Sequence, residues 1–196
     1  MSGFILASGS TIRRQILTGA GINFDVVKPG VDEDILKTKL AGSLPADLAL
    51  ALAKAKALAV SVQHPDALVL GADQILAMDG HVHDKPKDAG EARERLVLLR
   101  GKTHSLEGGL AAARGGEIVW THQSRAALTV RDFTDAFLTD YMQRAGDELT
   151  ASVGAYAYEG LGAHLFEAVE GDYYAILGLP LLPVLDLLRR EGVIAA

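Results

Sequence analysis

The segment from Ser8 to Arg13 has the residue types of an anion-binding turn. It follows the apolar pair Phe4-Ile5, which predicts a strand, and it carries two hydroxyl side chains, Ser8 and Ser10. Ser10 suits the N-cap of a helix with an apolar stripe starting at Ile12, which places Arg13 in the first helical turn. A helix N-terminus offers free N–H groups and partial positive charge, so an arginine there makes sense if phosphate lies opposite. The same pattern also fits solvated arginines on an ordinary strand-to-helix turn.

Further charged residues stand at unusual places along the chain. Asp73 interrupts an apolar strand, Lys54 lies on a helix that is apolar almost all round, and Lys85 precedes a proline that keeps its backbone extended. Each one alone also suits a structural role, such as a capped turn or a lysine that reaches solvent. Together with Glu33 and Arg13 they supply two acids and three bases. This mixture is typical of metal-assisted phosphoryl chemistry, in which carboxylates hold Mg²⁺ and activate water while cations neutralise phosphate oxygens.

The elements that must position these residues alternate along the chain. Interleaved strands, hairpins and helices predict an α/β fold with a mixed sheet, and no repeat or linker divides the 196 residues into separate domains. The acidic segment 31–34 is expected to be a turn, Asp79-Gly80 a hairpin turn, and 154–162 a glycine-rich loop. Strands are predicted at about 4–5, 24–27, 67–70, 75–78, 103–113, 117–130, 165–169 and 173–177, and helices from Ser10, at 45–62, at 88–99, after Thr134 and at 180–190.

Composition excludes several classes of function. A net charge of −6 argues against a broad nucleic-acid-binding face, although a local cluster of cations can still bind a small anion. The absence of cysteine excludes disulfides, thiol catalysis and cysteine-ligated zinc. No signal peptide is visible and no apolar segment is long enough to span a membrane, so we expect a cytoplasmic protein.

Two short motifs resemble a phosphate-binding loop and a zinc site, but each has a simpler interpretation. Arg100-Gly101-Lys102-Thr103 ends like a nucleotide-binding P-loop, but the required earlier glycine is Leu96 and the segment follows a helix rather than a strand. His81-x-His83 could place two imidazoles on one strand face, as zinc requires, but solvated histidines beyond a hairpin turn are the simpler interpretation.

The chain as a whole resembles the Maf family, also called septum-formation-inhibitor-like proteins, which are nucleoside triphosphate pyrophosphatases. The resemblance implies an elongated mixed sheet flanked by helices, with two lobes around a central cleft, in a single domain (Maf/ITPase-like). It also implies a homodimer that hydrolyses the bond between the α and β phosphates with a divalent metal, Mg²⁺ or alternatively Mn²⁺ or Co²⁺. The matching segments are Leu6-Ala7-Ser8-x-Ser10 with Arg13, Val31-Asp32-Glu33, Gly71-Ala72-Asp73-Gln74, Lys85-Pro86, Leu99-x-Gly101-Lys102-Thr103-His104, Gly160-Leu161-Gly162, Gly171-Asp172-Tyr173 and Gly178-Leu179-Pro180.

The resemblance assigns roles position by position. Asp73 matches the proposed general base, and Glu33 matches an acidic residue that helps to hold metal, so the implied metal ligands are Glu33 and Asp73. Lys54 and Lys85 match the two active-site lysines of the family. The residues matching the phosphate-facing positions are Ser8, Ser10 and Arg13.

The sequence departs from the family pattern where the substrate is chosen. Thr11 and Ile12 stand where proline and a first arginine are usual. Three positions associated with substrate choice align with Ile12, Gln74 and Glu159, and all three differ from the branch that acts on dTTP and UTP. Gln74 and Glu159 instead resemble the branch that acts on 7-methyl-GTP, and a glutamate can accept hydrogen bonds from a guanine edge or compensate a cationic methylated ring.

Other functions stay open at this point. The chain could be a dTTP/UTP pyrophosphatase, a non-catalytic nucleotide-binding regulator of cell division, or another metal-dependent phosphoesterase on the same fold. The intact set of Asp73, Glu33, Lys54 and Lys85 argues against a non-catalytic role. The expected partners are a nucleoside triphosphate and a second copy of the chain, with no nucleic acid and no membrane.

Overall fold

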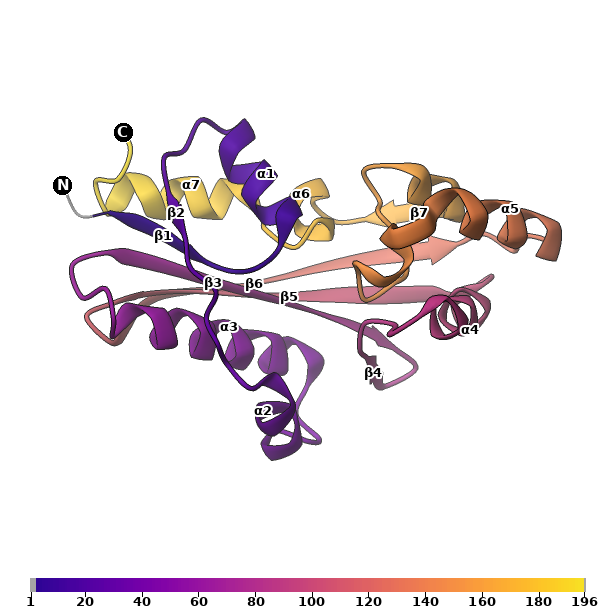
Figure 1. Cartoon of the computed structure of the whole chain (residues 1–196), viewed down its shortest axis with the longest axis horizontal. Helices are drawn as coiled ribbons and strands as arrows, with labels where there is room; N and C mark the ends of the chain where they lie inside the picture. The colour runs from indigo at the N-terminus through magenta and orange to yellow at the C-terminus, as the bar shows by residue number, and fades with distance from the viewer. Residues whose placement is uncertain (1–2, 196) are drawn as a thin grey trace. The chain divides into compact units, whose positions relative to one another are not determined.

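A computed structural model describes residues 3–195, which form a mixed α/β fold (Figure 1). Within these residues seven strands join in one sheet in the order β2-β1-β3-β5-β6-β7, with β4 beside β3. The chain divides into two compact units: unit 1 holds 1–74, 107–125 and 172–196, and unit 2 holds 75–106 and 126–171. Strands β3 (Leu68–Met78), β5 (Thr103–Arg114) and β6 (Glu117–Val130) contribute residues to both units.

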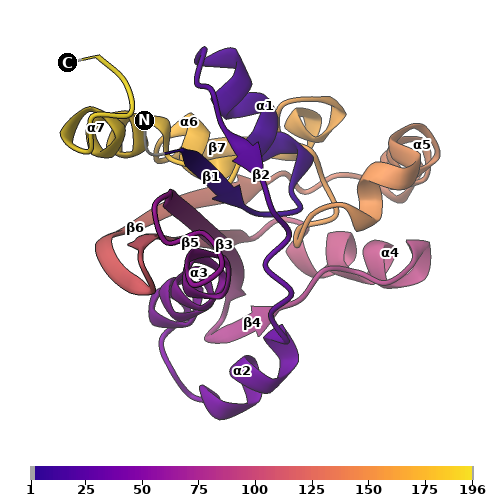
Figure 2. The same ribbon diagram turned by 60° about the vertical axis from the view of Figure 1, so that its left-hand side comes forward.

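Unit 1 is a sheet covered by helices on both faces (Figures 1 and 2). Strand β1 (Phe4–Ala7) pairs in parallel with β2 (Asp25–Val26) and with β3. On one face lie α1 (Thr11–Gly19), the short α6 (Tyr173–Ile176) and α7 (Leu181–Arg190), and on the other lies α3 (Pro45–Ser61). The remaining helix of this unit, α2 (Glu33–Lys39), precedes α3 and contacts it.

The alternation of side chains along the strands divides the core of unit 1 in two. Phe4 and Leu6 of β1 pack with α1 and α7, together with Leu68, Leu70 and Ala72 of β3. Ile5 and Val69 point the other way and pack with Val60 of α3. Because successive side chains of a strand point to opposite faces, odd-numbered residues of β3 lie on the α3 face.

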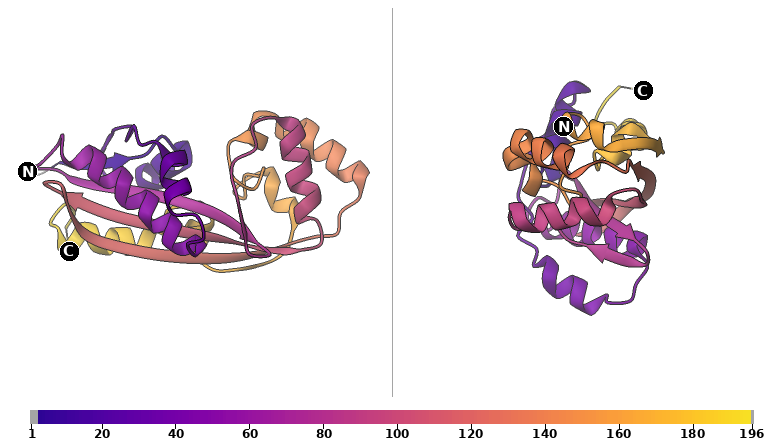
Figure 3. Two further views of the ribbon diagram at one scale, coloured as in Figure 1. Left: turned by 90° about the horizontal axis from the view of Figure 1, so that it is seen from below. Right: turned by 90° about the vertical axis from the view of Figure 1, so that its right-hand side faces the viewer.

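Unit 2 contains the ends of the long strands together with α4 (Ala89–Leu99), α5 (Asp135–Ala145), the 3₁₀ turns η1 (Gly146–Thr150) and η2 (Leu161–Leu165), and β7 (Phe166–Glu170). Helices α4 and α5 contact each other, and Figure 3 shows them in magenta and orange. Strand β4 (His81–His83) pairs antiparallel with β3 through the predicted Asp79-Gly80 turn. Both turn residues have positive φ, as this two-residue hairpin requires.

The structure differs from the sequence prediction in three elements. The strand expected to break at 71–74 instead continues as one strand, β3, from Leu68 to Met78. The acidic segment predicted as a turn instead begins α2, with Asp32 as N-cap accepting from the Ile35 amide at 3.1 Å. The strand predicted at 173–177 was wrong, because these residues form α6 with Asp172 as its cap. In both helices the capping aspartate favours the helix because it satisfies a free amide of the first turn.

Candidate active site

The predicted turn before α1 is held together by its own hydroxyl groups. Ser10 caps α1 and accepts from the Arg13 amide at 3.4 Å. Ser8, which is buried, accepts from the Ser10 amide at 3.2 Å and from Arg13 Nη1 at 3.3 Å. The two serines therefore set the backbone of the turn and orient Arg13.

Arg13 is a fixed cation in the interior of unit 1. Its Nε donates to the Gly178 carbonyl at 2.9 Å and its Nη1 to the Ala72 carbonyl at 2.8 Å. Burial lowers the pKa of Arg13, whereas the charges of Asp73 and Glu33 raise it, and a guanidinium stays protonated in proteins. Gly178 has φ +85°, and a Cβ there would lie 3.3 Å from Arg13 Nη2, so glycine leaves room for the arginine.

A lysine lies between the two predicted carboxylates. Lys56 Nζ is 2.5 Å from Asp73 Oδ1 and 2.8 Å from Glu33 Oε1. Lys56 and Asp73 are only 7% and 8% exposed, whereas the side chain of Glu33 is 40% exposed. With Arg13 in electrostatic reach of both carboxylates, the cluster contains two cations and two anions from α1, α2, α3 and β3.

The lysine of this cluster is Lys56; Lys54 does not join it, and its role as an active-site lysine stays a prediction. Residues two apart on a helix are separated by about 200° around its axis, so the two lysines point to nearly opposite sides of α3. Within residues 3–195 Lys54 forms no ion pair with Asp73 or Glu33, and it is half-buried. A signal for Lys56 was present, because it continues the i, i+4 stripe of buried positions Leu48, Leu52 and Val60.

Gly71 of β3 lets α3 pack close enough to the sheet for Lys56 to reach Asp73. A Cβ at Gly71 would overlap the Ala53 carbonyl and lie 2.7 Å from the Ala57 nitrogen. These two residues bracket Lys56 on α3, and Gly71 precedes Asp73 by two residues on the same face of β3. The backbone of the helical turn that carries Lys56 therefore lies directly on Gly71.

Gln74, the neighbour of Asp73, faces the other side of the sheet. Its amide nitrogen donates to the carbonyls of Ala175 and Ile176 at 2.8 and 3.1 Å. The expectation that Gln74 offers a substrate both a donor and an acceptor is therefore corrected, since both amide hydrogens bind α6 and only Oε1 is left to accept. Ile12 is half-buried and packs against the core cluster that contains Leu6 and Leu179.

The remaining two predicted site residues belong to unit 2. Lys85 is exposed and follows β4, next to the buried Pro86. Glu159 is exposed in the turn that precedes η2. Their assignment to the site stays a prediction.

The His81-x-His83 motif does not belong to a group of side chains, within residues 3–195, that could hold a metal ion. Among residues 3–195 no group of three or more His, Asp or Glu side chains is arranged to hold a metal ion. His81 is exposed, whereas the Nε2 atom of His83 is buried and lacks a hydrogen-bond partner in the described structure. Burial lowers the pKa of His83, and Arg95 and His81 lower it further.

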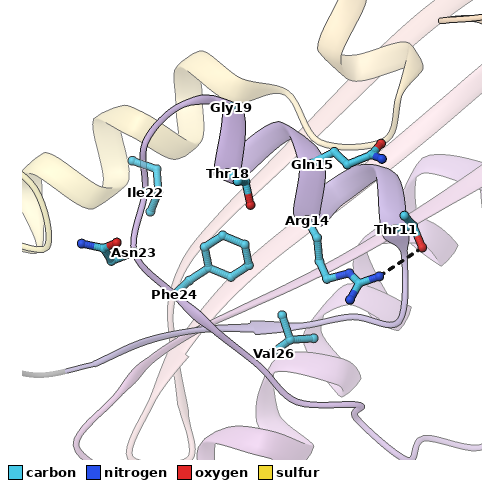
Figure 4. Close-up of a pocket in the computed structure, with 9 residues that line it drawn as sticks. All are labelled: Thr11, Arg14, Gln15, Thr18, Gly19, Ile22, Asn23, Phe24 and Val26. Atoms are coloured by element: carbon cyan, nitrogen blue, oxygen red, sulfur yellow. Dashed lines mark hydrogen bonds between the residues drawn. The ribbon is translucent and has the colours of Figure 1, made fainter.

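A surface hollow of unit 1 is lined by none of the four residues of the charged cluster. It has a volume of about 710 Å³ and lies against α1 and the segment leading into β2 (Figure 4). Arg14 lines it and donates to Thr11 Oγ1 at 3.2 Å, beside Phe24. Arg13 is not among the lining residues, because neighbouring residues on a helix point about 100° apart.

Comparison with known proteins supports the resemblance across the chain. The family described as Maf-like protein matches residues 3–191. A nucleoside triphosphate pyrophosphatase of Maricaulis maris is 56% identical over 99% of both chains, and one of Rhodospirillum rubrum is 48% identical over 97% of this chain and 95% of its own. A 7-methyl-GTP pyrophosphatase of Rhizobium meliloti is 46% identical over 98% of both chains. On this evidence the chain belongs to the Maf family.

Proposed function

We propose that this protein hydrolyses nucleoside triphosphates between the α and β phosphates, releasing a nucleoside monophosphate and pyrophosphate. The observation that carries the proposal is the buried contact of Lys56 with Asp73 and Glu33, next to the fixed guanidinium of Arg13. Burying such charges is costly, and clusters of this kind are concentrated at functional sites. The names of the relatives from Maricaulis maris and Rhodospirillum rubrum support the same activity.

Each residue of the cluster has a chemical role in this proposal. Arg13 and Lys56 neutralise charge that develops on the phosphate oxygens as the Pα–O bond breaks. Asp73 is bound to Lys56 through Oδ1, so its second oxygen can accept a proton from the attacking water as that water's oxygen bonds to the α phosphorus. Pyrophosphate leaves with the bridging oxygen. Lys85 of unit 2 is proposed to bind phosphate as well.

The donor set fits a divalent cation that arrives with the triphosphate. Asp73 and Glu33 are close enough to share one ammonium group, and Mg²⁺ is usually held by one or two carboxylates together with substrate phosphates and water. The described residues supply no third carboxylate or imidazole for a complete protein cage. We therefore propose Asp73 and Glu33 as the metal ligands, with Mg²⁺ ahead of Mn²⁺ or Co²⁺; the ion would polarise the phosphate oxygens.

We propose 7-methyl-GTP as the preferred substrate, with dTTP and UTP as the alternative. The relative named 7-methyl-GTP pyrophosphatase, at 46% identity, supports this choice. On this chain the proposal depends chiefly on Glu159, whose carboxylate is exposed and can accept from a purine edge. Gln74 can contribute an acceptor oxygen, and Ile12 an apolar surface.

The setting in the cell is likewise a proposal. None of the helices described between residues 3 and 195 is long and apolar enough to cross a membrane. We propose a cytoplasmic homodimer that removes non-standard nucleotides, with a role in septum formation as the alternative. Sedimentation of the purified chain measures its oligomeric state directly.

A panel of nucleotides tests activity and specificity together. Release of pyrophosphate, rather than orthophosphate, is measured with 7-methyl-GTP, GTP, dTTP and UTP, with and without added Mg²⁺. We expect the highest kcat/KM for 7-methyl-GTP, and a roughly 10- to 100-fold fall for Glu159→Gln with this substrate, since losing a charge-assisted hydrogen bond costs about 1.5–3 kcal/mol.

Glu167→Gln is the matched control, because Glu167 is an exposed carboxylate on β7 of the same unit. It should leave the ranking of the four nucleotides unchanged. A higher kcat/KM for dTTP or UTP would overturn the purine preference, and orthophosphate as the product would overturn the pyrophosphatase assignment.

A further inference from the structure

Arg95 forms hydrogen bonds with two segments of unit 2 that are distant in the sequence. It lies on α4 and is half-buried. Its Nη1 atom donates to the carbonyl of Asp84 at 3.1 Å and also to the carbonyl of Val153. One guanidinium nitrogen thus uses both of its hydrogens on backbone oxygens 69 residues apart in the sequence.

The two carbonyls lie next to the two residues of unit 2 to which the proposed function gives a role. The carbonyl of Asp84 belongs to the peptide bond that leads into Lys85. This segment leaves β4 and has no regular secondary structure before α4 begins. A side chain that holds the Asp84 carbonyl therefore limits where the backbone of Lys85 can lie.

The carbonyl of Val153 belongs to a loop that several side-chain hydrogen bonds hold as far as Tyr156. Ser152 Oγ donates to the Tyr156 carbonyl at 2.6 Å and accepts from its amide at 3.1 Å. Tyr141 donates to the Ala155 carbonyl at 3.2 Å, and the Tyr156 hydroxyl lies 2.7 Å from His104 Nε2.

The next residues connect this core of the loop to Glu159. The amides of Gly160 and Gly162 both donate to the Ala157 carbonyl, at 3.2 and 3.0 Å. A Cβ at Gly162 would lie 2.9 Å from Tyr156 Cβ, so the turn folds closely onto the buried tyrosine. Hydrogen bonds thus hold successive parts of the backbone between Ser152 and Gly162, on both sides of Glu159.

The surroundings of Arg95 suit a permanent positive charge. Burial lowers the pKa of Arg95, whereas the charges of Asp84 and Glu91 raise it. A side chain without a donor at this position would leave the Asp84 and Val153 carbonyls without this hydrogen bond, and for the part-buried Val153 contact that loss is unfavourable. Arg93, two residues earlier on α4, is exposed, and within residues 3–195 its side chain donates to neither of these carbonyls.

We propose that Arg95 is a positioning residue that holds the Lys85 segment and the Glu159 loop in one arrangement, and so couples phosphate binding to recognition of the base. The proposal rests on the proposed function of Lys85 and Glu159. Arg95 acts through the backbone of both segments and does not itself touch the substrate.

The test compares Arg95→Gln and Arg95→Lys with the control Arg93→Gln. The first measurement is amide hydrogen exchange of the purified protein without nucleotide. We expect Arg95→Gln to speed exchange at least tenfold both at 84–87 and at 153–160, while α3 and α7 keep their protection. Arg95→Lys should restore part of the protection, because an ammonium can still donate to two carbonyls. Faster exchange at only one segment, or at neither, would overturn the coupling.

The second measurement separates positioning from stability. With 7-methyl-GTP and dTTP as substrates, Arg95→Gln should raise KM at least fivefold and reduce the selectivity between the two nucleotides, with a smaller change in kcat. An equal loss for both nucleotides at unchanged KM would overturn the proposal. If Lys85→Met and Glu159→Gln leave the kinetics unaltered while the exchange result holds, then the roles given to those residues fail and the structural coupling stands.

Discussion

Replacing Lys56 by methionine is the sharpest test of the charged cluster. The change keeps the length of the side chain but removes the ammonium that is 2.5 Å from Asp73 and 2.8 Å from Glu33. Lys54→Met is the matched control, because it makes the same substitution two residues away on the same helix. Only Lys56 is buried against both carboxylates.

The expected loss of stability follows from the burial of each group. Removing one partner of a buried ion pair costs about 3–5 kcal/mol. The lower end applies here, because the Glu33 side chain is 40% exposed and Arg13 still compensates part of the charge. We expect Lys56→Met to lower the free energy of unfolding by about 3 kcal/mol and Lys54→Met by less than about 1 kcal/mol, as for ordinary surface substitutions.

The expected effect on catalysis is separate from that on folding. Loss of one preorganised group that stabilises developing charge lowers kcat by about 10²–10³-fold. Pyrophosphate release is measured at saturating nucleotide, at a temperature where circular dichroism shows both variants to be folded. An equal or larger fall in kcat for Lys54→Met, or wild-type kcat for Lys56→Met, would refute the assignment.

Two further predictions concern packing and pH. Gly71→Ala forces the turn that carries Lys56 away from the sheet by about 1 Å. This should lower the free energy of unfolding by about 1–3 kcal/mol and kcat at least tenfold. Gly3→Ala, which lies in open space, should change neither quantity in urea-unfolding and activity assays. His104 is 2% exposed, and burial, then Arg95 and His83, lower its pKa from 6.5 to about 4. The unfolded chain therefore binds a proton first as pH falls, so stability is lost between pH 6.5 and about 4, by about 3 kcal/mol in all. Urea unfolding at several pH values should show this slope, and a His104→Gln variant with the same slope would contradict it.

Much of the fold could be predicted because its signals are local. The stripe of apolar residues predicted α3 from Pro45, and the Asp88 cap predicted α4. Both were confirmed, as were the long strands β5 and β6. The residue types at Arg13, Glu33 and Asp73 likewise indicated phosphate chemistry, because buried or interrupting charges require partners wherever the chain folds. The structure brings these three together.

The sequence by itself determined most of the elements, though not α2 or α6, and which residues could carry charge chemistry, but not which face each side chain takes. The alternation along β3 sends Asp73 to α3 and Gln74 to α6, where its amide binds the backbone. The choice of Lys56 over Lys54 follows from the side of α3 that rests on Gly71, and the link made by Arg95 depends on loops distant in sequence. Local propensity sets the period of an element, whereas the rotation and depth at which it packs are set by the whole core, and only the tertiary structure fixes those.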